Sequence, residues 1–150
     1  MDDNLSPLRR PTELPAVRHP RDLYDRWRTL MTPLGFSRRT MWFAILDADG
    51  VMSPQLTQID DLPAQVGLSE CLPLLEMIDM IVSAVMPTGS AALLYSRPGR
   101  DAMNDTDRSW GRSLTAAAET VSVSLWPVHF ANDRELKVFA PDELGWPRAS

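Results

Sequence analysis

The sequence LLYSRPGRDAMNDTD, residues 93–107, decides the fold because it joins the end of a hydrophobic strand to the start of an acidic helix. The strand ends at Tyr95, and Arg97-Pro98-Gly99-Arg100 is typical of a loop. Asn104, with Asp107 three residues later, is a pattern found at helix N-termini, where such side chains accept backbone N–H groups. The stretch therefore predicts a strand, a short loop and a helix in direct succession.

Further elements are expected on both sides of this stretch. Upstream, Ser90–Tyr95 is short and apolar, as is typical of a central strand covered on both faces. Before it, Ser69 is expected to cap a helix over Glu70–Met86, which has one narrow polar stripe and should be mostly buried against a sheet. Downstream, the pattern predicts a helix to about Val121, then strands over Ser122–Phe130 and Leu136–Phe139 around a turn at Asn132-Asp133.

The N-terminal part predicts an arm, a helix and a hairpin. Prolines at 7, 11, 15 and 20 indicate an extended arm over residues 1–20, because each lacks an amide donor and restricts its neighbour. Apolar residues at helical spacing predict an amphipathic helix over Arg21–Met31. Thr40–Leu46 is expected as a strand, joined by the turn residues Asp47-Ala48-Asp49-Gly50 to a return strand near Val51–Ile59, whose Pro54 indicates an edge or a bulge.

This order of elements predicts a single α/β domain. An apolar helix, a buried strand and a second amphipathic helix favour a three-layer α/β/α arrangement with a mixed sheet, preceded by the arm and one helix. We expect the arm over residues 1–20, the domain over 21–144 and a C-terminal tail over 145–150. The chain has 150 residues, of which 44% are hydrophobic, and this suits one core.

Composition argues against several classes of function. The net charge of −5 disfavours sequence-independent binding of nucleic acid, which needs several cationic contacts to phosphates. The longest apolar stretch, Leu72–Met86, contains Pro73, Glu76 and Asp79 and is shorter than the roughly 20 residues of a membrane span. The first 20 residues lack the apolar core of a signal peptide, so the default expectation is a cytoplasmic location.

One candidate chemistry involves paired aspartates. The sequence ILDADGV, residues 45–51, resembles the first motif of the haloacid dehalogenase-like phosphatases, where one Asp is the nucleophile and the next a general acid. That resemblance implies a magnesium-dependent enzyme using Asp47 and Asp49. Such enzymes also need a later Lys and an acidic pair, whereas the sole Lys here is Lys137 and Asp60-Asp61 follows too closely. A hairpin turn requires Asp-Gly for its own reasons, so we favour the turn.

Residues suited to metal or thiol chemistry are few. His19, His129 and one cysteine have no zinc-ligand spacing, so we expect neither a metal nor another cofactor. His129 lies on an expected strand and is interpreted as structural. Cys71 falls in the first turn of a helix, where a lowered thiol pKa would suit a redox sensor, although free cysteines are usually buried. Whether Cys71 is redox-active stays open at this point.

The strand, loop and helix start over residues 93–107, with the small residues at 114–118 and Pro127-Val128-His129, resemble the JAB/MPN metalloprotease-like fold, a cytidine-deaminase-like fold, and in particular its RadC-like branch. The resemblance extends over about residues 36–140 and rests mainly on the order of elements. In that family the strand end reads His-x-His-Pro, both histidines hold zinc, and an Asp at the start of the next helix is the third ligand. The resemblance implies this fold for the present chain.

The departures from the family concern its zinc ligands. Tyr95 and Arg97 stand where the two histidines would be, while Pro98 and Asp107 match the family pattern. A guanidinium has no free lone pair and repels a divalent cation, so these residues cannot replace two imidazoles. The family's upstream catalytic Glu has no match in the hairpin. We therefore expect a non-catalytic member without zinc.

The altered loop is the candidate ligand- or partner-binding site. Arg97 and Arg100 flank a loop that leads to the helix N-terminus at Asn104, and together with Tyr95 and Asp107 they could hold an anion, a small ligand or a partner's carboxylate. The alternative is that Arg97 pairs with Asp107 and only closes the structure.

These observations lead us to expect a non-enzymatic protein-interaction or regulatory module with a protein partner, no cofactor, and no nucleic acid or membrane. The arm could order on a partner. Trp146 is the tryptophan we expect to be exposed, whereas Trp42, Trp110 and Trp126 are expected in the core. The edge strand near residues 51–59 leaves homodimer formation open, and the aspartate phosphatase and the anion-binding loop remain the alternative functions.

Overall fold

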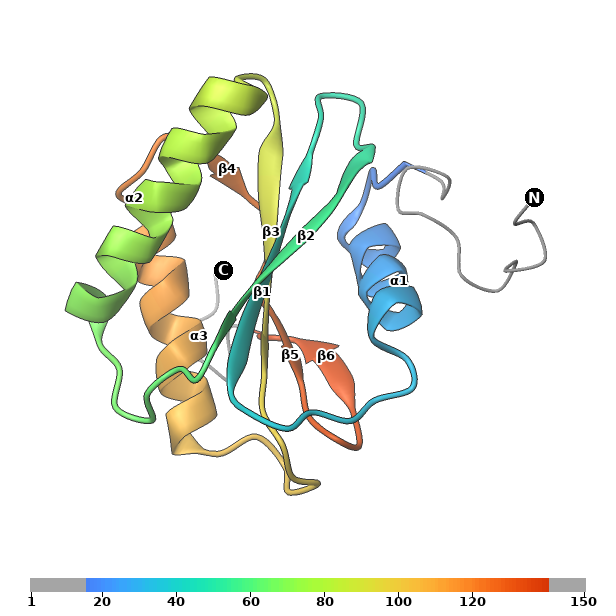
Figure 1. Cartoon of the computed structure of the whole chain (residues 1–150), viewed down its shortest axis with the longest axis vertical. Helices are drawn as coiled ribbons and strands as arrows, with labels where there is room; N and C mark the ends of the chain where they lie inside the picture. Colours follow the sequence, from blue (N-terminus) through green and yellow to red (C-terminus); the bar gives the residue numbers. More distant parts are fainter. Residues whose placement is uncertain (1–15, 141–150) are drawn as a thin grey trace, which may run out of the picture.

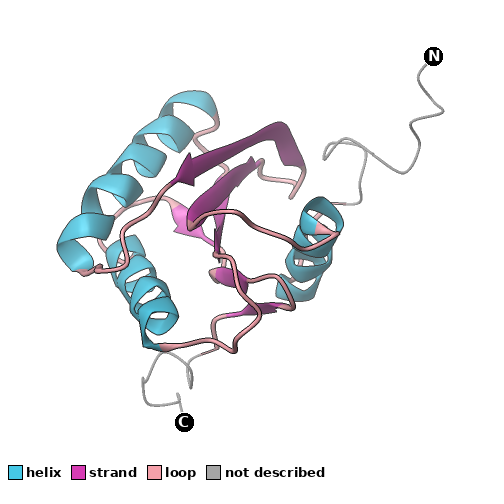
Figure 2. Cartoon of the chain, turned by 60° about the horizontal axis from the view of Figure 1, so that its bottom comes forward, coloured by secondary structure: helices cyan, strands magenta, loops and turns pink. Residues whose placement is uncertain are grey.

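Three helices and six strands make up residues 16–140, the part of the chain that the computed structural model describes. Two of the helices, α2 and α3, cover one face of the sheet, and α1 covers the other (Figures 1 and 2). An α/β domain with a mixed sheet is therefore confirmed. Most of the expected arm and the tail with Trp146 lie outside the described residues. The elements are α1 (Pro20–Met31), β1 (Thr40–Leu46), β2 (Met52–Asp60), α2 (Leu68–Val85), β3 (Ser90–Ser96), α3 (Asp105–Ala118), β4 (Ser124–Leu125), β5 (His129–Ala131) and β6 (Leu136–Val138).

The sheet is mixed because β3 has an antiparallel neighbour on one side and parallel neighbours on the other. The strand order is β2-β1-β3-β5-β6, and β4 pairs with β3 ahead of β5. β1 is antiparallel to both β2 and β3. β3 is buried along nearly its whole length, as its apolar sequence predicted for a central strand.

The hairpin between β1 and β2 forms as the sequence predicted. The backbone N–H groups of Asp49 and Val51 both donate to Asp47 Oδ1, at 2.9 Å each. Gly50 has a φ of 85°, a conformation that favours glycine over other residues. β2 lies at the edge of the sheet, so Pro54 occupies an edge strand, where a missing amide donor is tolerated.

The core consists of two apolar clusters, one on each face of the sheet. Leu75 and Ile78 of α2 and Trp110 and Leu114 of α3 pack on one face. On the other face, Trp27 of α1 belongs to the second cluster. Of the tryptophans expected in the core, Trp110 is buried, whereas Trp42 and Trp126 are half-buried and pack against the cluster beneath α1.

Helix α2 differs from the prediction at its start and in its burial. Its N-cap is Gly67 rather than Ser69, and the Gly67 N–H donates to Glu70 Oε1 at 2.6 Å. The expectation of a mostly buried helix was wrong, because only Cys71, Leu75, Ile78 and Val82 are buried and the side of α2 that faces away from the core is exposed. No helix within residues 16–140 is long and apolar enough to cross a membrane.

The expected strand over residues 122–130 is interrupted. It forms two short strands, β4 and β5, which are separated at Trp126–Val128. Pro127 lies in the break, where its lack of an N–H prevents a continuous ladder. α3 also ends at Ala118 instead of near Val121, because the N–H groups of Glu119 and Thr120 turn back onto Ala116 and Ala117.

Candidate functional site

The end of β3 and the first turn of α3 bring Tyr95, Arg97 and Asp107 together. Arg97 Nε lies 3.0 and 3.1 Å from the two carboxylate oxygens of Asp107, and Arg97 Nη2 lies 2.8 Å from Asp107 Oδ2. Asp107 is completely buried and Arg97 is only 7% exposed. Arg97 thus pairs with Asp107, which was one of the two arrangements that the sequence left open. The pair is buried and charge-assisted.

Tyr95 extends this cluster to Arg39, which directly precedes β1. Its hydroxyl donates to Asp107 Oδ1 at 3.0 Å and accepts a hydrogen bond from Arg39 Nε at 3.0 Å. Burial, and then the nearby Asp107 charge, raise the pKa of Tyr95, so its hydroxyl keeps the proton that it donates. The ring stacks on Trp110 at a centroid distance of 5.7 Å. We call Arg39, Tyr95, Arg97, Asn104 and Asp107 the Asp107 cluster.

The remaining donors of Arg97 are directed at backbone carbonyls. Nη1 donates to the Pro98 carbonyl at 3.1 Å, and Nη2 donates to those of Asp101 at 2.9 Å and Ala102 at 3.2 Å. The hydrogen bonds to Asp107 raise the pKa of Arg97, which keeps the guanidinium charged. All three guanidinium nitrogens therefore donate inside the molecule.

Asn104 caps α3 as its sequence pattern predicted. Asn104 Oδ1 accepts from the Asp107 N–H, and Asp107 Oδ2 accepts from the Asn104 N–H, both at 2.9 Å. This reciprocal capping box uses the helix N-terminus that the anion-binding hypothesis needed. The Asp107 carboxylate now accepts from Tyr95, Arg97 and Asn104, so the described geometry offers it to no external ligand.

Arg100, the last of the predicted site residues, is exposed in the loop and is not part of the Asp107 cluster. The loop is held by Asp133, a residue that the sequence indicated only as part of a turn. Asp133 accepts from the N–H groups of Phe36 and Gly99, each at 2.8 Å, and these bonds lower its pKa. Neither Asp133 nor Arg39 carried a sequence signal for these roles, because their partners are distant along the chain. Asp133 is 97 residues from Phe36 and 34 from Gly99, and Arg39 is 56 residues from Tyr95.

The zinc that the family resemblance implies does not fit these residues. An arginine already paired with Asp107 occupies the position of one imidazole, and a protonated tyrosine occupies the other. Within residues 16–140 there is no group of three or more His, Cys, Asp or Glu side chains that could hold a metal ion. We derive no zinc chemistry for this site.

The paired aspartates of the hairpin have structural surroundings. Asp47 Oδ1 holds the turn through two backbone hydrogen bonds, and Asp49 is exposed. The sole lysine, Lys137, lies on β6, at the opposite edge of the sheet from β2. The groups that phosphoryl transfer would need are thus not gathered near Asp47.

Cys71 and His129 are both buried inside the domain. Burial raises the pKa of the Cys71 thiol to about 11, which is opposite to the lowering expected at a helix N-terminus and keeps the thiol protonated at pH 7. Burial lowers the pKa of His129 to about 4, and its Nδ1 lies 3.1 Å from the Pro127 carbonyl. His129 is therefore a neutral core residue at pH 7.

Sequence reasoning missed an open apolar surface on α2. Pro73, Met77, Met80 and Ala84, at helical spacing, face away from the core and are exposed, with Met80 at 70%. Around the helix toward β2, Val85 is 66% exposed and Ile81 is half-buried. Ile81 and Val85 line a groove of about 200 Å³ between α2 and the β1–β2 hairpin. We call Met77, Met80, Ile81, Val85 and this groove the α2–β2 surface.

No family model and no curated protein matches the sequence of this chain. The likeness to the JAB/MPN fold therefore rests on the element order and on the loop over residues 93–107 alone.

Proposed function

We propose that this chain is a non-catalytic protein-interaction module on a JAB/RadC-like domain, and that it binds its partner at the α2–β2 surface. The observation that carries this proposal is the row of exposed apolar side chains along α2 beside an open groove. Contiguous exposed apolar surface on a folded domain is a mark of interaction sites. Flexible methionines such as Met77 and Met80 are also common at binding surfaces.

The edge of the sheet adds a second element to this surface. β2 pairs with β1 on one side, and within residues 16–140 no strand pairs with its other side. An extended segment of a partner could continue the sheet there, with alternate side chains over the groove. Ser53, Gln55 and Thr57 of β2 line that groove and offer polar contacts at its border.

The charge around the surface indicates what partner it suits. Residues 40–96 contain seven Asp and Glu residues and no Lys or Arg. Asp47 and Asp49 lie in the turn before β2, and Glu70 lies in the first turn of α2. A second copy docked about a two-fold axis would bring the same acidic residues of both copies together, and their charges would repel. The surface therefore suits a different protein that presents apolar residues flanked by Lys or Arg.

The test is capture from the source cells followed by reconstitution. Tagged wild-type protein and the Met77→Glu/Met80→Glu variant are used as baits, and retained proteins are identified by mass spectrometry. We expect one stoichiometric protein with the wild type that is absent with the variant. That protein, once purified, should bind wild type directly, with an affinity that weakens as salt is added.

Ser83→Glu is the matched control, because it adds a carboxylate to an exposed position of the same helix outside the apolar row. This control should bind as the wild type does. Equal direct binding by the Met77→Glu/Met80→Glu variant would refute the proposed surface. A wild-type protein that sediments as a dimer and becomes a monomer in that variant would show that a second copy is the partner.

A further inference from the structure

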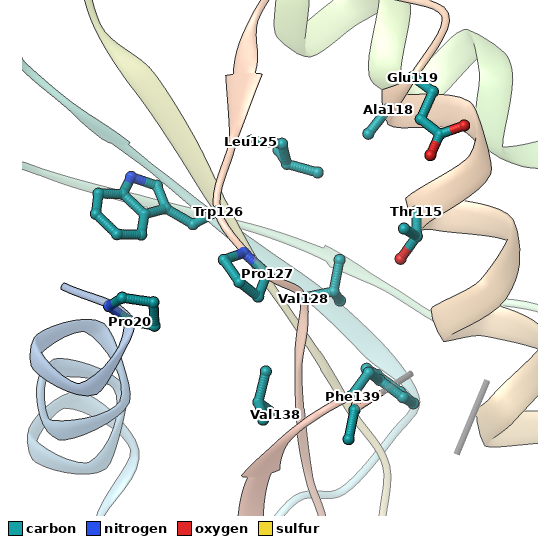
Figure 3. Close-up of a pocket in the computed structure, with 11 residues that line it drawn as sticks. Pro20, Thr115, Ala118, Glu119, Leu125, Trp126, Pro127, Val128, Val138 and Phe139 are labelled. Atoms are coloured by element: carbon teal, nitrogen blue, oxygen red, sulfur yellow. The ribbon is translucent and has the colours of Figure 1, made fainter. Parts of the chain in front are cut away.

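A second open apolar site lies near β4 and β6, away from the edge of the sheet that β2 forms. It is a pocket of about 620 Å³ between the C-terminal end of α3, the β4–β5 connection, β6 and the start of α1 (Figure 3). Its walls are formed mainly by Leu125, Pro127, Val128, Val138 and Phe139. The volume is within the range of ligand-binding sites in proteins.

The pocket results from the interrupted strand. β6 pairs with β5 over three residues only, and β4 pairs with β3 but with no strand on its outer side in the described part of the chain. The Pro127 break thus leaves the region beside β4 without the strand that would otherwise fill it. The apolar side chains of Val128 and Phe139 are buried at its base.

The pocket has one charged wall residue, Glu119, which is exposed at the end of α3. The other polar side chains of the wall already have partners, because Thr115 Oγ1 donates to the Gly111 carbonyl at 2.7 Å and Trp126 Nε1 donates to Ser90 Oγ at 2.8 Å. An occupant should therefore bring a large apolar group together with a cation or another hydrogen-bond donor for Glu119.

The chain itself carries such a segment, which follows a residue of the pocket wall in the sequence. Ala140 lines the pocket and is followed by ten residues, PDELGWPRAS. Trp146 is six residues beyond Ala140, a length that spans up to about 20 Å when extended. Arg148 follows two residues later and is complementary in charge to Glu119.

We propose that the C-terminal segment, residues 141–150, binds this pocket, with the Trp146 side chain inside it and the Arg148 guanidinium beside Glu119. The tether makes this intramolecular binding favourable, because a short linker gives an effective concentration on the order of millimolar. Burial of an indole removes a large apolar area from water. This inference concerns a surface separate from α2–β2 and does not depend on the function proposed above.

Fluorine NMR of the full chain labelled with 5-fluorotryptophan tests the proposal. The Trp146 signal is assigned from its loss in Trp146→Phe, and its access to water is measured with a soluble gadolinium chelate. We expect the chelate to relax Trp146 weakly in the wild type and strongly in Val138→Glu, which places a charge in the pocket. Val85→Glu is the matched control, because it makes the same substitution at an exposed position on α2, and Trp146 should stay protected there.

A charge exchange examines the second contact. Glu119→Lys should reduce the protection of Trp146, and Glu119→Lys with Arg148→Glu should restore it. Strong relaxation of Trp146 in the wild type, equal to that in Val138→Glu, would overturn the proposal. Protection that disappears on dilution would also overturn it, because the occupant would then be the segment of another copy.

Discussion

The Asp107 cluster and the α2–β2 surface differ in how their chemical groups are used. In the cluster, two arginines, a tyrosine and an aspartate converge, and their hydrogen bonds are made to one another and to backbone carbonyls. On α2, large apolar side chains such as Met80 and Val85 are exposed in the part of the chain that the structure describes. The polar site is closed although its composition suggests chemistry, whereas the open surface is mainly apolar, with polar side chains of β2 at the border of its groove. This difference is the reason why we propose binding at the α2–β2 surface.

The largest effect is expected from breaking the cluster. Asp107→Ala leaves the Arg97 guanidinium buried without its counter-ion, and we expect a loss of about 3–5 kcal/mol in the free energy of unfolding. Urea denaturation measures it. Asp105→Ala, which removes only the exposed pair with Arg108, should cost less than about 1 kcal/mol. Equal, small losses in both variants would mean that the cluster does not stabilise the fold.

A second prediction extends the comparison to His129, a buried polar group on the other face of the sheet. Its folded pKa of about 4 lies below the ordinary 6.5, so the unfolded chain takes up the proton first. The buried, neutral His129 therefore contributes its full stabilisation above about pH 6.5. This stabilisation is lost as pH falls toward 4, and the loss reaches about 2 kcal/mol by pH 5. The difference between wild type and His129→Phe should show this slope. Parallel stability curves from pH 7 to 5 would contradict it.

A third prediction concerns Phe139. The centroid of its ring lies 6.4 Å from that of Tyr95, and Phe139 also lines the pocket of about 620 Å³ shown in Figure 3. A methyl group at Gly111 would lie 2.6 Å from Phe139 Cδ1. We expect Gly111→Ala to lower the melting temperature, with a loss of about 1–3 kcal/mol. Gly35→Ala places the same methyl group in open space and should be neutral. If Gly111→Ala left the stability unchanged, the Phe139 ring would be shown to move away from the added methyl group without cost.

The smallest effect is expected on the exposed side of α2. Met80→Glu should change the free energy of unfolding by less than about 0.5 kcal/mol, because Met80 is 70% exposed and loses little buried area. Ile78→Ala, two residues away and fully buried, should cost about 2–5 kcal/mol. Denaturation of both variants compares the two sides of one helix. A large loss in Met80→Glu would show that this side is part of the core.

Local signals predicted much of this structure. The Asn104 and Asp107 capping box and the Asp47–Gly50 turn depend on residues within four positions of each other, so their patterns could be interpreted from the sequence. Pro127 was a signal for the break between β4 and β5, although one strand over residues 122–130 was expected. The burial of α2 could not be predicted from local signals. Its composition showed an apolar helix, but burial depends on neighbours that no local pattern specifies.

The Asp107 cluster was predictable only in part. The loop and the capped helix placed Arg97 near Asp107, and the ion pair was one of two arrangements considered. The contribution of Arg39, and the hold of Asp133 on Phe36 and Gly99, arise from contacts between segments far apart in the chain. Arg97 is not available to a ligand because its donors are directed at Asp107 and at nearby backbone carbonyls, a point that the residue types alone left open.

Calorimetric titration of the purified partner into wild type, Met80→Glu and Arg100→Ala tests the central claim most directly. Arg100 is the exposed arginine of the loop beside the Asp107 cluster, so the two variants probe the two regions under comparison. We predict that Met80→Glu weakens the affinity at least about tenfold, or 1.4 kcal/mol, and that Arg100→Ala leaves it unchanged. Loss of binding in Arg100→Ala, with unchanged affinity in Met80→Glu, would contradict the account and place the partner at the loop.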